Sequence, residues 1–204
     1  MRGKSMKHLV ITIGCEYGAK GNAIGKKIAQ DLGIKFYDRD LVDEIIKEVG
    51  IPTDIMDRVE EGGTIAGKGA QGDVRGSFSK YADLTDRAIH VQKQIIRKLA
   101  QKEACVIIGR SADYILKDDP DAYHIFICGN EAEKIARTQK LFDLSEKEAR
   151  NMNQDMDKKR RLHYEYYTDR KWGDFKNHCM ILNTSVLGLE RCIQYIVELI
   201  EAAE

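Results

Sequence analysis

Three glycines follow a short apolar segment near the start of the chain, and their spacing indicates a site that binds an anion. Residues 9–13 are rich in β-branched side chains, as buried strands are. Gly14, Gly18 and Gly21 then interrupt this segment, and apolar residues recur at helical spacing over residues 22–32. A strand, a glycine-rich turn and a helix N-terminus direct backbone N–H groups at one point, where a phosphate group would bind. The alternative is an ordinary β–α turn without a ligand.

The turn departs from the phosphate-loop pattern G-x-x-x-x-G-K-[ST], and two registers are possible. If Gly14 is the first glycine, Lys20 is the lysine, Ala19 replaces the second glycine and Gly21 replaces the hydroxyl residue. If the strand and the helix are aligned without a gap, Gly21 takes the place of the lysine. We prefer this second register because it keeps the apolar residues of the helix on its inner face. Lys20 would then reach a phosphate from the neighbouring position.

Cationic side chains that suit a phosphate occur in two further places. Arg110 comes directly after the apolar segment 104–108, and the carboxyl ends of parallel strands are where open α/β folds bind ligands. An Arg fork matches the geometry of a phosphate, although a structural ion pair with a neighbouring acid is the alternative. Residues 158–161 are four consecutive lysines and arginines on a predicted helix. They are typical of a solvated helix face, and three nearby tyrosines make RNA a weaker alternative.

Five short apolar segments alternate with segments of helical periodicity, which predicts an α/β fold with a mostly parallel sheet covered on both faces. Ser145 is predicted to cap a long helix that continues to about residue 167. Leu41, Ile45 and Ile46 are predicted to face inward from a helix that follows residue 40. The predicted strands are residues 9–13, 34–37, 104–108, 124–128 and 179–182, and the other predicted helices are 22–32, 81–102, one from about 130, and 189–200.

The length of 204 residues suits one domain over residues 1–204. Six of the 17 glycines fall between residues 62 and 76. We expect a mobile segment at about residues 60–80, which is either a solvated loop or a loop that orders over a substrate. The other expected special segment is helical and lid-like, at about residues 140–175.

Composition excludes several classes of protein. The 33 basic and 33 acidic residues cancel, so there is no overall charge that favours nucleic acid or a membrane surface. No apolar run has the length of a membrane span. Five scattered cysteines, none with metal-ligand spacing, predict reduced core residues of a cytoplasmic protein and no metal site built from protein ligands. The five histidines are dispersed as well, so a hydrolase triad has no support. Nothing in the sequence indicates the oligomeric state.

Four segments together resemble the cytidylate kinase-like family, a branch of the nucleoside monophosphate kinases within the P-loop kinases. They are ITIGCEYGAKGNAIGKKIAQDLGIKFYDRDLV, VIIGRSADYIL, DMDKKRRLHYEYYTDRKWG and MILNTSVLGLE, and they extend over nearly the whole chain. The resemblance implies a three-layer, adenylate-kinase-like fold with a five-stranded parallel sheet flanked by helices. It also implies transfer of the γ-phosphate of ATP to CMP or dCMP, with Mg²⁺, and hence nucleotide substrates as partners.

The resemblance assigns the ATP side of the site to two segments. The turn at residues 14–23 corresponds to the phosphate loop, and residues 183 and 184 correspond to a segment near the ATP base. Well-established cytidylate kinases have a loop lysine followed by Gly-Thr, whereas this chain has Gly21, Asn22 and Ala23 in the gapless register. The hydroxyl on the Mg²⁺ side is therefore missing. The ATP-binding residues implied are Gly14, Gly18, Ala19, Lys20, Gly21, Asn22, Ala23, Asn183 and Thr184.

The resemblance also assigns the acceptor side and the lid. Asp38 and Arg39 follow the second strand, where the family places contacts to the monophosphate, and Arg110 corresponds to the arginine that holds the acceptor phosphate. Asp157 and Arg160 correspond to a D-x-x-R element of the lid, whose first family arginine is replaced here. The residues expected to act on the transferring phosphate are Lys20, Arg110, Arg137, Arg160 and Arg161.

Two other functions fit the same residues. A nucleotide- or phosphate-binding protein that kept the fold but lost transfer would explain the altered loop. A kinase for another small acceptor is equally compatible, because neither the fold nor the phosphate loop specifies the acceptor.

Overall fold

The core of the protein is a sheet of five parallel strands in the order β2-β3-β1-β4-β5. We describe residues 9–48, 50 and 75–203 from a computed structural model. All five predicted strands are confirmed, and their ends lie within two residues of the predicted ends. The strands are β1 (Val10–Cys15), β2 (Lys35–Tyr37), β3 (Cys105–Ile108), β4 (Ala122–Cys128) and β5 (Met180–Asn183).

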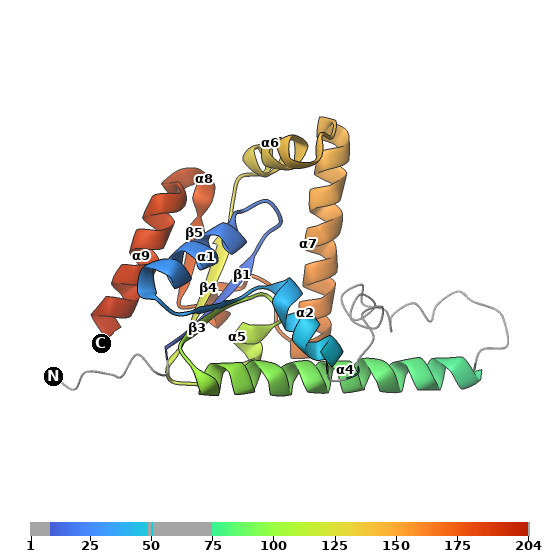
Figure 1. The fold of residues 1–204 in the computed structure, drawn as a ribbon. Coiled ribbons are helices and arrows are strands. Elements are labelled where there is room, and N and C mark those ends of the chain that lie inside the picture. The colour runs from blue at the N-terminus through green and yellow to red at the C-terminus, as the bar shows by residue number, and fades with distance from the viewer. Residues whose placement is uncertain (1–8, 49, 51–74, 204) are drawn as a thin grey trace.

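The predicted helices are confirmed within the described residues, and three short ones are added (Figure 1). The helix predicted over 81–102 begins earlier, at Arg75, and most of the glycine-rich segment at 60–80 lies outside the described residues. The helices are α1 (Gly21–Leu32), α2 (Arg39–Glu48), α4 (Arg75–Lys102), α5 (Ala112–Ile115), α6 (Glu131–Phe142), α7 (Glu146–Thr168), the 3₁₀ helix η2 (Phe175–Asn177), α8 (Thr184–Leu187) and α9 (Leu189–Ala203).

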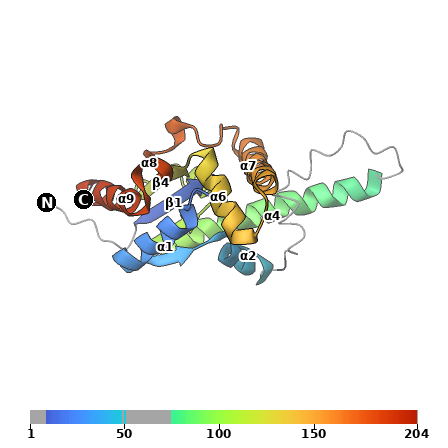
Figure 2. The ribbon, with the colours of Figure 1, turned by 90° about the horizontal axis from the view of Figure 1, so that it is seen from above.

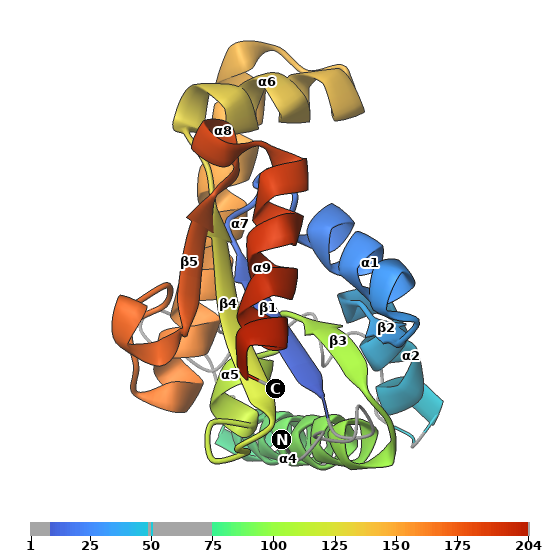
Figure 3. The same ribbon diagram turned by 90° about the vertical axis from the view of Figure 1, so that its left-hand side faces the viewer.

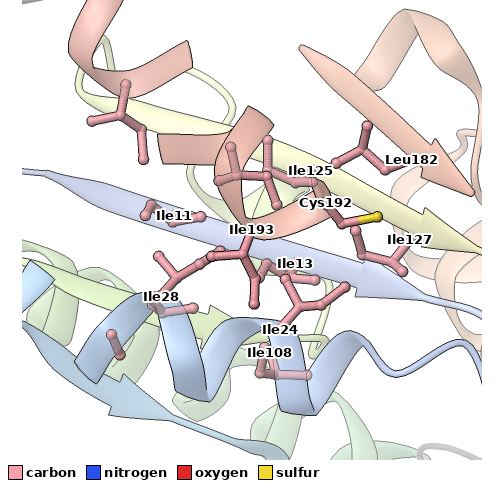
Figure 4. Close-up of a cluster of buried hydrophobic side chains, with 14 of the residues drawn as sticks. Ile11, Ile13, Ile24, Ile28, Ile108, Ile125, Ile127, Leu182, Cys192 and Ile193 are labelled. Atoms are coloured by element: carbon pink, nitrogen blue, oxygen red, sulfur yellow. The ribbon is translucent and has the colours of Figure 1, made fainter. Parts of the chain in front are cut away.

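Helices cover both faces of the sheet, as predicted. On one face α1 and α9 pack on β1, β3 and β4 through a cluster of fully buried isoleucines (Figures 3 and 4). On the other face α4 packs with α2 and α5 around a second cluster. The prediction for Leu41 is wrong: it is 37% exposed, and its neighbour Val42 is fully buried instead. The reason is that Val42 and Ile46, four residues apart on α2, form the stripe that faces the core.

The helices α6 and α7 pack against each other beyond the carboxyl end of the sheet (Figures 1 and 2). The predicted cap of α7 is confirmed, since the Ser145 side chain accepts the Glu148 N–H and the Glu148 carboxylate accepts the Ser145 N–H. This reciprocal pair satisfies two backbone donors and sets where α7 begins. From there α7 runs 23 residues, from α6 to the level of the sheet (Figure 1).

The five cysteines show how far composition predicts burial. Cys105 in β3 and Cys192 in α9 are buried, as predicted, and Cys15 and Cys128 are half-buried. Cys179 is exposed, contrary to the prediction, because it precedes β5, which has no further strand on its outer side. Among the described residues, no helix combines the length and the apolar character that crossing a membrane requires.

The turn between β1 and α1 brings the start of the helix against the end of the strand. A Cβ atom added to Gly21 would lie 2.5 Å from the Cβ of Cys15 and 2.7 Å from its Sγ. The chain reaches this contact through two residues with left-handed backbone, Gly18 (φ 76°) and Lys20 (φ 66°). Lys20 is therefore the residue that caps α1. No side chain larger than hydrogen fits at position 21 without displacement of the strand end.

Beneath this turn, β1 and β4 are linked by a polar contact inside the sheet. Thr12 Oγ1 lies 2.8 Å from His124 Nδ1, and the two residues are register partners. Burial is the main reason why the pKa of His124 is lowered from its ordinary value of 6.5, and the nearby Asp113 carboxylate opposes this shift. The ring is therefore favoured in its neutral form in the folded protein.

We predict that Gly21→Ala destabilises the fold by about 1–3 kcal/mol, because the added methyl group meets the Cβ of Cys15 rather than the movable end of a long side chain. Lys26→Ala, on an exposed position of the same helix, is the matched control and should change the free energy of unfolding by about 0.5 kcal/mol or less. Denaturant unfolding of the two variants measures both values. Equal stability of the two variants would contradict the close contact.

We also predict that His124 makes the protein less stable as the pH falls. In the unfolded chain the ring takes up a proton near pH 6.5, but in the folded protein only at lower pH. The stability that His124 contributes is thus present above about pH 6.5 and is lost as the pH falls toward the folded pKa. Urea unfolding at pH 7.5 and 5.5 should show a smaller loss for His124→Gln than for the natural chain. The same loss in both proteins would rule out this role.

Candidate functional site

A cavity of about 350 Å³ lies at the carboxyl end of the sheet, between β1, β3, β4 and α7. Its position agrees with the general rule that open α/β sheets bind ligands at this edge. The cavity begins at the residues that end β1 and lead into the glycine-rich turn. It is lined by Gly14, Cys15, Arg39, Ile108, Gly109, Arg110, Ser111, Asp113, Phe126, Met156, Lys159, Arg160, His163, Tyr164, Trp172 and His178.

Four cationic side chains reach the cavity: Arg39, Arg110, Lys159 and Arg160. Arg110 is held most firmly, because its side chain is only 1% exposed and its guanidinium forms an ion pair with Asp43 of α2. The Nε of Arg39 lies 3.9 Å from the same carboxylate. Arg110 therefore has features of both sequence-based interpretations. Its side chain lines a cavity at the edge of the sheet, and it also forms an ion pair.

The backbone around Arg110 is left-handed over three consecutive residues. The φ angles of Gly109, Arg110 and Ser111 are 67°, 55° and 51°. Residues other than glycine rarely adopt this conformation, and it is concentrated at functional sites. The carbonyl of Arg110 accepts a hydrogen bond of 3.1 Å from the Gln92 side chain of α4, which fixes the turn from below. The chain thus leaves β3 abruptly and directs Arg110 into the cavity.

An acidic and aromatic corner forms another part of the cavity wall. The buried Asp113 accepts a hydrogen bond of 2.5 Å from the Tyr164 hydroxyl, and its Oδ2 lies 3.9 Å from Nε2 of His178. Burial, and next the Asp113 carboxylate, raise the pKa of Tyr164. The Phe126 ring makes edge contacts with Trp172 at 5.2 Å and with His178 at 5.3 Å. These groups offer a flat ring an apolar wall and polar atoms at its edge.

The glycine-rich turn borders this cavity on the side of α6 and α8. Lys20, Asn22 and Ala23 are exposed, whereas Ala19 is buried. The Thr184 hydroxyl lies 3.2 Å from both the Ala19 and the Cys128 carbonyl oxygens. The structure therefore brings the residues implied for the ATP side together at α1 and α8. The role of Thr184 in the structure is to fasten the turn to β4 and α8.

Glu16, Lys134 and Asp157 form a cluster of charged side chains next to the turn, and this cluster was not predicted from the sequence. Lys134 of α6 donates to Glu16 Oε2 at 2.8 Å and lies 3.7 Å from Asp157 Oδ2. Asp157 Oδ1 accepts the backbone N–H of Tyr17 at 2.6 Å, and Glu16 accepts that of Gly129 at 3.1 Å. Burial is the main cause that raises the pKa of Asp157. One signal was available, since Lys134 stands beside Ile135 on the inner face of α6.

The predicted lid residues occupy different positions. Arg160 lines the cavity and donates to the Cys15 carbonyl at 2.8 Å, and its guanidinium lies over the Tyr17 ring. Arg161 is exposed and lies over the Trp172 ring, and it does not line the cavity. Arg137 is half-buried on α6, and burial is the main cause that lowers its pKa. Of these three arginines, only Arg160 lines the cavity.

Asp38 and Asp157 do not line the cavity. Asp38 accepts the backbone N–H of Leu41 at 3.0 Å and so caps the start of α2. Its neighbour Arg39 does line the cavity. The pairing of Asp157 with Arg160 that the resemblance implies takes an indirect form: the two lie one helical turn apart on α7, and both contact the glycine-rich turn.

The described residues hold no group of three or more His, Cys, Asp or Glu side chains placed to bind a metal ion. Glu16 in the glycine-rich turn and Asp157, which accepts a backbone N–H of that turn, are both engaged with Lys134. These side chains do not form a dedicated Mg²⁺ site.

Solved structures with the same fold include kinases. An uncharacterized protein from Eubacterium ventriosum ATCC 27560 has a TM-score of 0.74 and 27% identity, over 95% of this chain and 98% of that one. Shikimate kinase from Bacteroides thetaiotaomicron has a TM-score of 0.53 and 16% identity, over 95% and 98% of the two chains. A gluconokinase from Sinorhizobium meliloti 1021 has a TM-score of 0.53 and 14% identity, over 98% and 97%. At these identities the two kinases show the fold alone, which is that of the P-loop kinases.

None of the curated proteins compared with the chain matches it. A sequence profile of the cytidylate kinase-like family matches residues 10–186, which include the glycine-rich turn, the cavity and α7. This match covers well over half of the chain, and the chain therefore belongs to the cytidylate kinase-like family.

Proposed function

We propose that this protein is a nucleoside monophosphate kinase that transfers the γ-phosphate of ATP to CMP or dCMP. The observation that carries the proposal is the position of the cationic cavity. It begins at Gly14 and Cys15, the residues from which the glycine-rich turn departs. A donor phosphate on the turn and an acceptor phosphate in the cavity would therefore meet at the end of β1. Phosphoryl transfer needs this alignment and charge neutralisation more than covalent chemistry from the protein.

The cavity suits a mononucleotide acceptor. Its volume of about 350 Å³ falls in the range of small-molecule sites. Arg110 and Arg39 would hold the acceptor phosphate, and the wall of Phe126 and Trp172 would receive the base. Asp113, which is buried at the aromatic end, would accept a hydrogen bond from an amino group on that base. These assignments require the Arg110 guanidinium to donate hydrogen bonds to Asp43 and to the phosphate at the same time, as an Arg fork can.

The glycine-rich turn suits the donor. Backbone N–H groups of residues 18–22 would hold the β-phosphate, Lys20 would lie nearby, and Asn183 and Thr184 would lie near the base. Arg160 lines the cavity beside the turn and would act between the two phosphates, whereas Arg137 and Arg161 would have to move to reach them. Mg²⁺ would enter on the phosphates of ATP, since the turn offers it no hydroxyl; we assign no step to it.

A second candidate is a nucleotide-binding protein without transfer activity. Two observations favour it: the contact at Gly21 excludes a lysine from the position that the gapless register assigns to it, and Asp157 accepts a backbone N–H that a phosphate would use. A kinase for another small acceptor is a third possibility, which the fold leaves open.

The deciding experiment measures ADP formation from ATP and Mg²⁺ with CMP, dCMP, UMP, AMP and GMP in turn. We expect turnover that depends on CMP or dCMP. Turnover with another monophosphate only would keep the class of reaction and change the acceptor. Folded protein that binds ATP but turns over none of the five would favour the binding protein or another small acceptor.

We predict that Arg110→Lys raises KM for the acceptor about tenfold or more, because a lysine keeps the charge beside Asp43 but loses the fork that binds phosphate. Arg110→Ala is the poorer test, since it would leave Asp43 without its buried partner. Arg191→Lys, on an exposed position of α9, is the matched control. If steady-state kinetics give Arg110→Lys the same acceptor KM as the control, Arg110 does not bind the acceptor phosphate.

A further inference from the structure

The glycine-rich turn cannot carry its own lysine where the gapless register requires one. The start of α1 is pressed against Cys15, so position 21 accepts only glycine. Lys20, one residue earlier, is exposed and has left-handed backbone at the helix cap. A phosphate bound by backbone N–H groups would still bring negative charge into a partly buried site. A cation from another element would stabilise that charge.

Lys134 of α6 is a cation in the right place. It is 8% exposed, and long charged side chains are rarely this buried unless they are paired. Its backbone packs on the turn, since a Cβ added to Gly18 would lie 3.2 Å from the Lys134 carbonyl oxygen. The Thr138 hydroxyl donates to that same carbonyl at 3.1 Å. The position of Lys134 is therefore fixed relative to the turn at both its backbone and its ammonium group.

The Tyr17 backbone N–H in the turn and the Lys134 ammonium group already share one carboxylate. The carboxylate of Asp157 accepts the Tyr17 backbone N–H at Oδ1 and lies near the Lys134 ammonium group at Oδ2, at 2.6 and 3.7 Å. A carboxylate with its two oxygens on a loop N–H and a lysine occupies the place that two phosphate oxygens would take. Glu16, at 2.8 Å from the same ammonium group, stays as the neutralising partner.

We propose that Lys134 binds the donor phosphate in place of the missing lysine of the turn, and that the phosphate displaces the Asp157 carboxylate when it binds. The inference rests on the proposed function, since it requires a nucleotide phosphate on the glycine-rich turn. Binding exchanges one anion for another at the same two donors, so Lys134 keeps two anionic partners before and after. The ligand recognised this way is the diphosphate portion of ADP or ATP.

The test compares four variants by calorimetric titration with ADP. Lys134→Met keeps the length of the side chain and removes the charge, and Lys134→Arg restores the charge. Lys140→Met, on an exposed position of the same helix, is the matched control. Asp157→Asn keeps the shape but weakens the competing anion. Circular dichroism and thermal melting report whether each variant folds.

We expect Lys134→Met to weaken ADP binding about tenfold or more, which is the loss of one charge-assisted contact. Lys134→Arg should stay within about threefold of the natural chain, and Lys140→Met should not change binding. Asp157→Asn should bind ADP more tightly, because the phosphate no longer competes with a charged carboxylate. If these two residues only braced α6 and α7 against the turn, both Lys134→Met and Asp157→Asn would weaken binding.

The other possible results of these titrations also support or contradict the proposal. A folded Lys134→Met that binds ADP as the natural chain does overturns it, and so does an Asp157→Asn that binds ADP no better. If Lys134→Met fails to fold, the direction of the Asp157→Asn effect decides alone. A natural chain that binds neither ADP nor ATP overturns this inference together with the proposed function. Binding by the natural chain that Lys134→Met retains overturns the inference only.

Discussion

The contact between Gly21 and Cys15 is the constraint on which the rest of the site depends. It joins the first residue of α1 to the last residue of β1 so closely that position 21 has no room for a side chain. A strand and a helix packed this tightly still form a turn whose N–H groups converge. They leave that turn without a lysine at the position where a regular phosphate loop carries one. Apart from the exposed Lys20, the cations next to the turn and the cavity come from elements that are distant in the sequence.

The cationic side chains on those elements are already paired with acidic side chains of the same chain. Arg110 is paired with Asp43, and Lys134 with Glu16 and Asp157; our proposals assign the two cations to the acceptor and the donor phosphate. A buried cation without a partner would cost several kcal/mol, so such pairs stabilise the folded chain. They also mean that a substrate phosphate must share or replace a carboxylate. The net affinity for a phosphate is then the difference between the free energies with which the phosphate and the carboxylate bind the same donors.

The fold could be predicted because its signals are local. Each strand is a short apolar run, and the capping box at Ser145 lies within four residues. The charge cluster could not be predicted in this way, because Glu16 and Lys134 are 118 residues apart in the sequence. The only local trace is a lysine on the inner face of an amphipathic helix. Arg110 was found because its position after a buried strand places it at the sheet edge in any parallel α/β fold.

Errors in the prediction have the same origin. Leu41 was expected inside because it is apolar, but the start of α2 at Arg39 and the packing of α4 select Val42 instead. The assignment of Arg137, Arg160 and Arg161 to the transferring phosphate stays a prediction, and adjacent residues on a helix face different ways. Only Arg160 turns to the cavity, where it contacts the end of β1. Side-chain direction depends on where a helix begins and on its neighbours, and neither is written in a short segment.

Under the proposed function, the acidic and aromatic corner of the cavity selects the acceptor. Shikimate kinase and gluconokinase share the fold, so the fold cannot choose among acceptors. The buried Asp113 could choose, because one oxygen of its carboxylate, Oδ2, accepts the Tyr164 hydroxyl and lies 3.9 Å from His178. Under the proposed function, an acceptor that donates a hydrogen bond here would satisfy a buried carboxylate, whereas one that presents an acceptor atom would be disfavoured. This polar corner, more than the cations shared by all phosphate sites, would then set the chemistry of the second substrate.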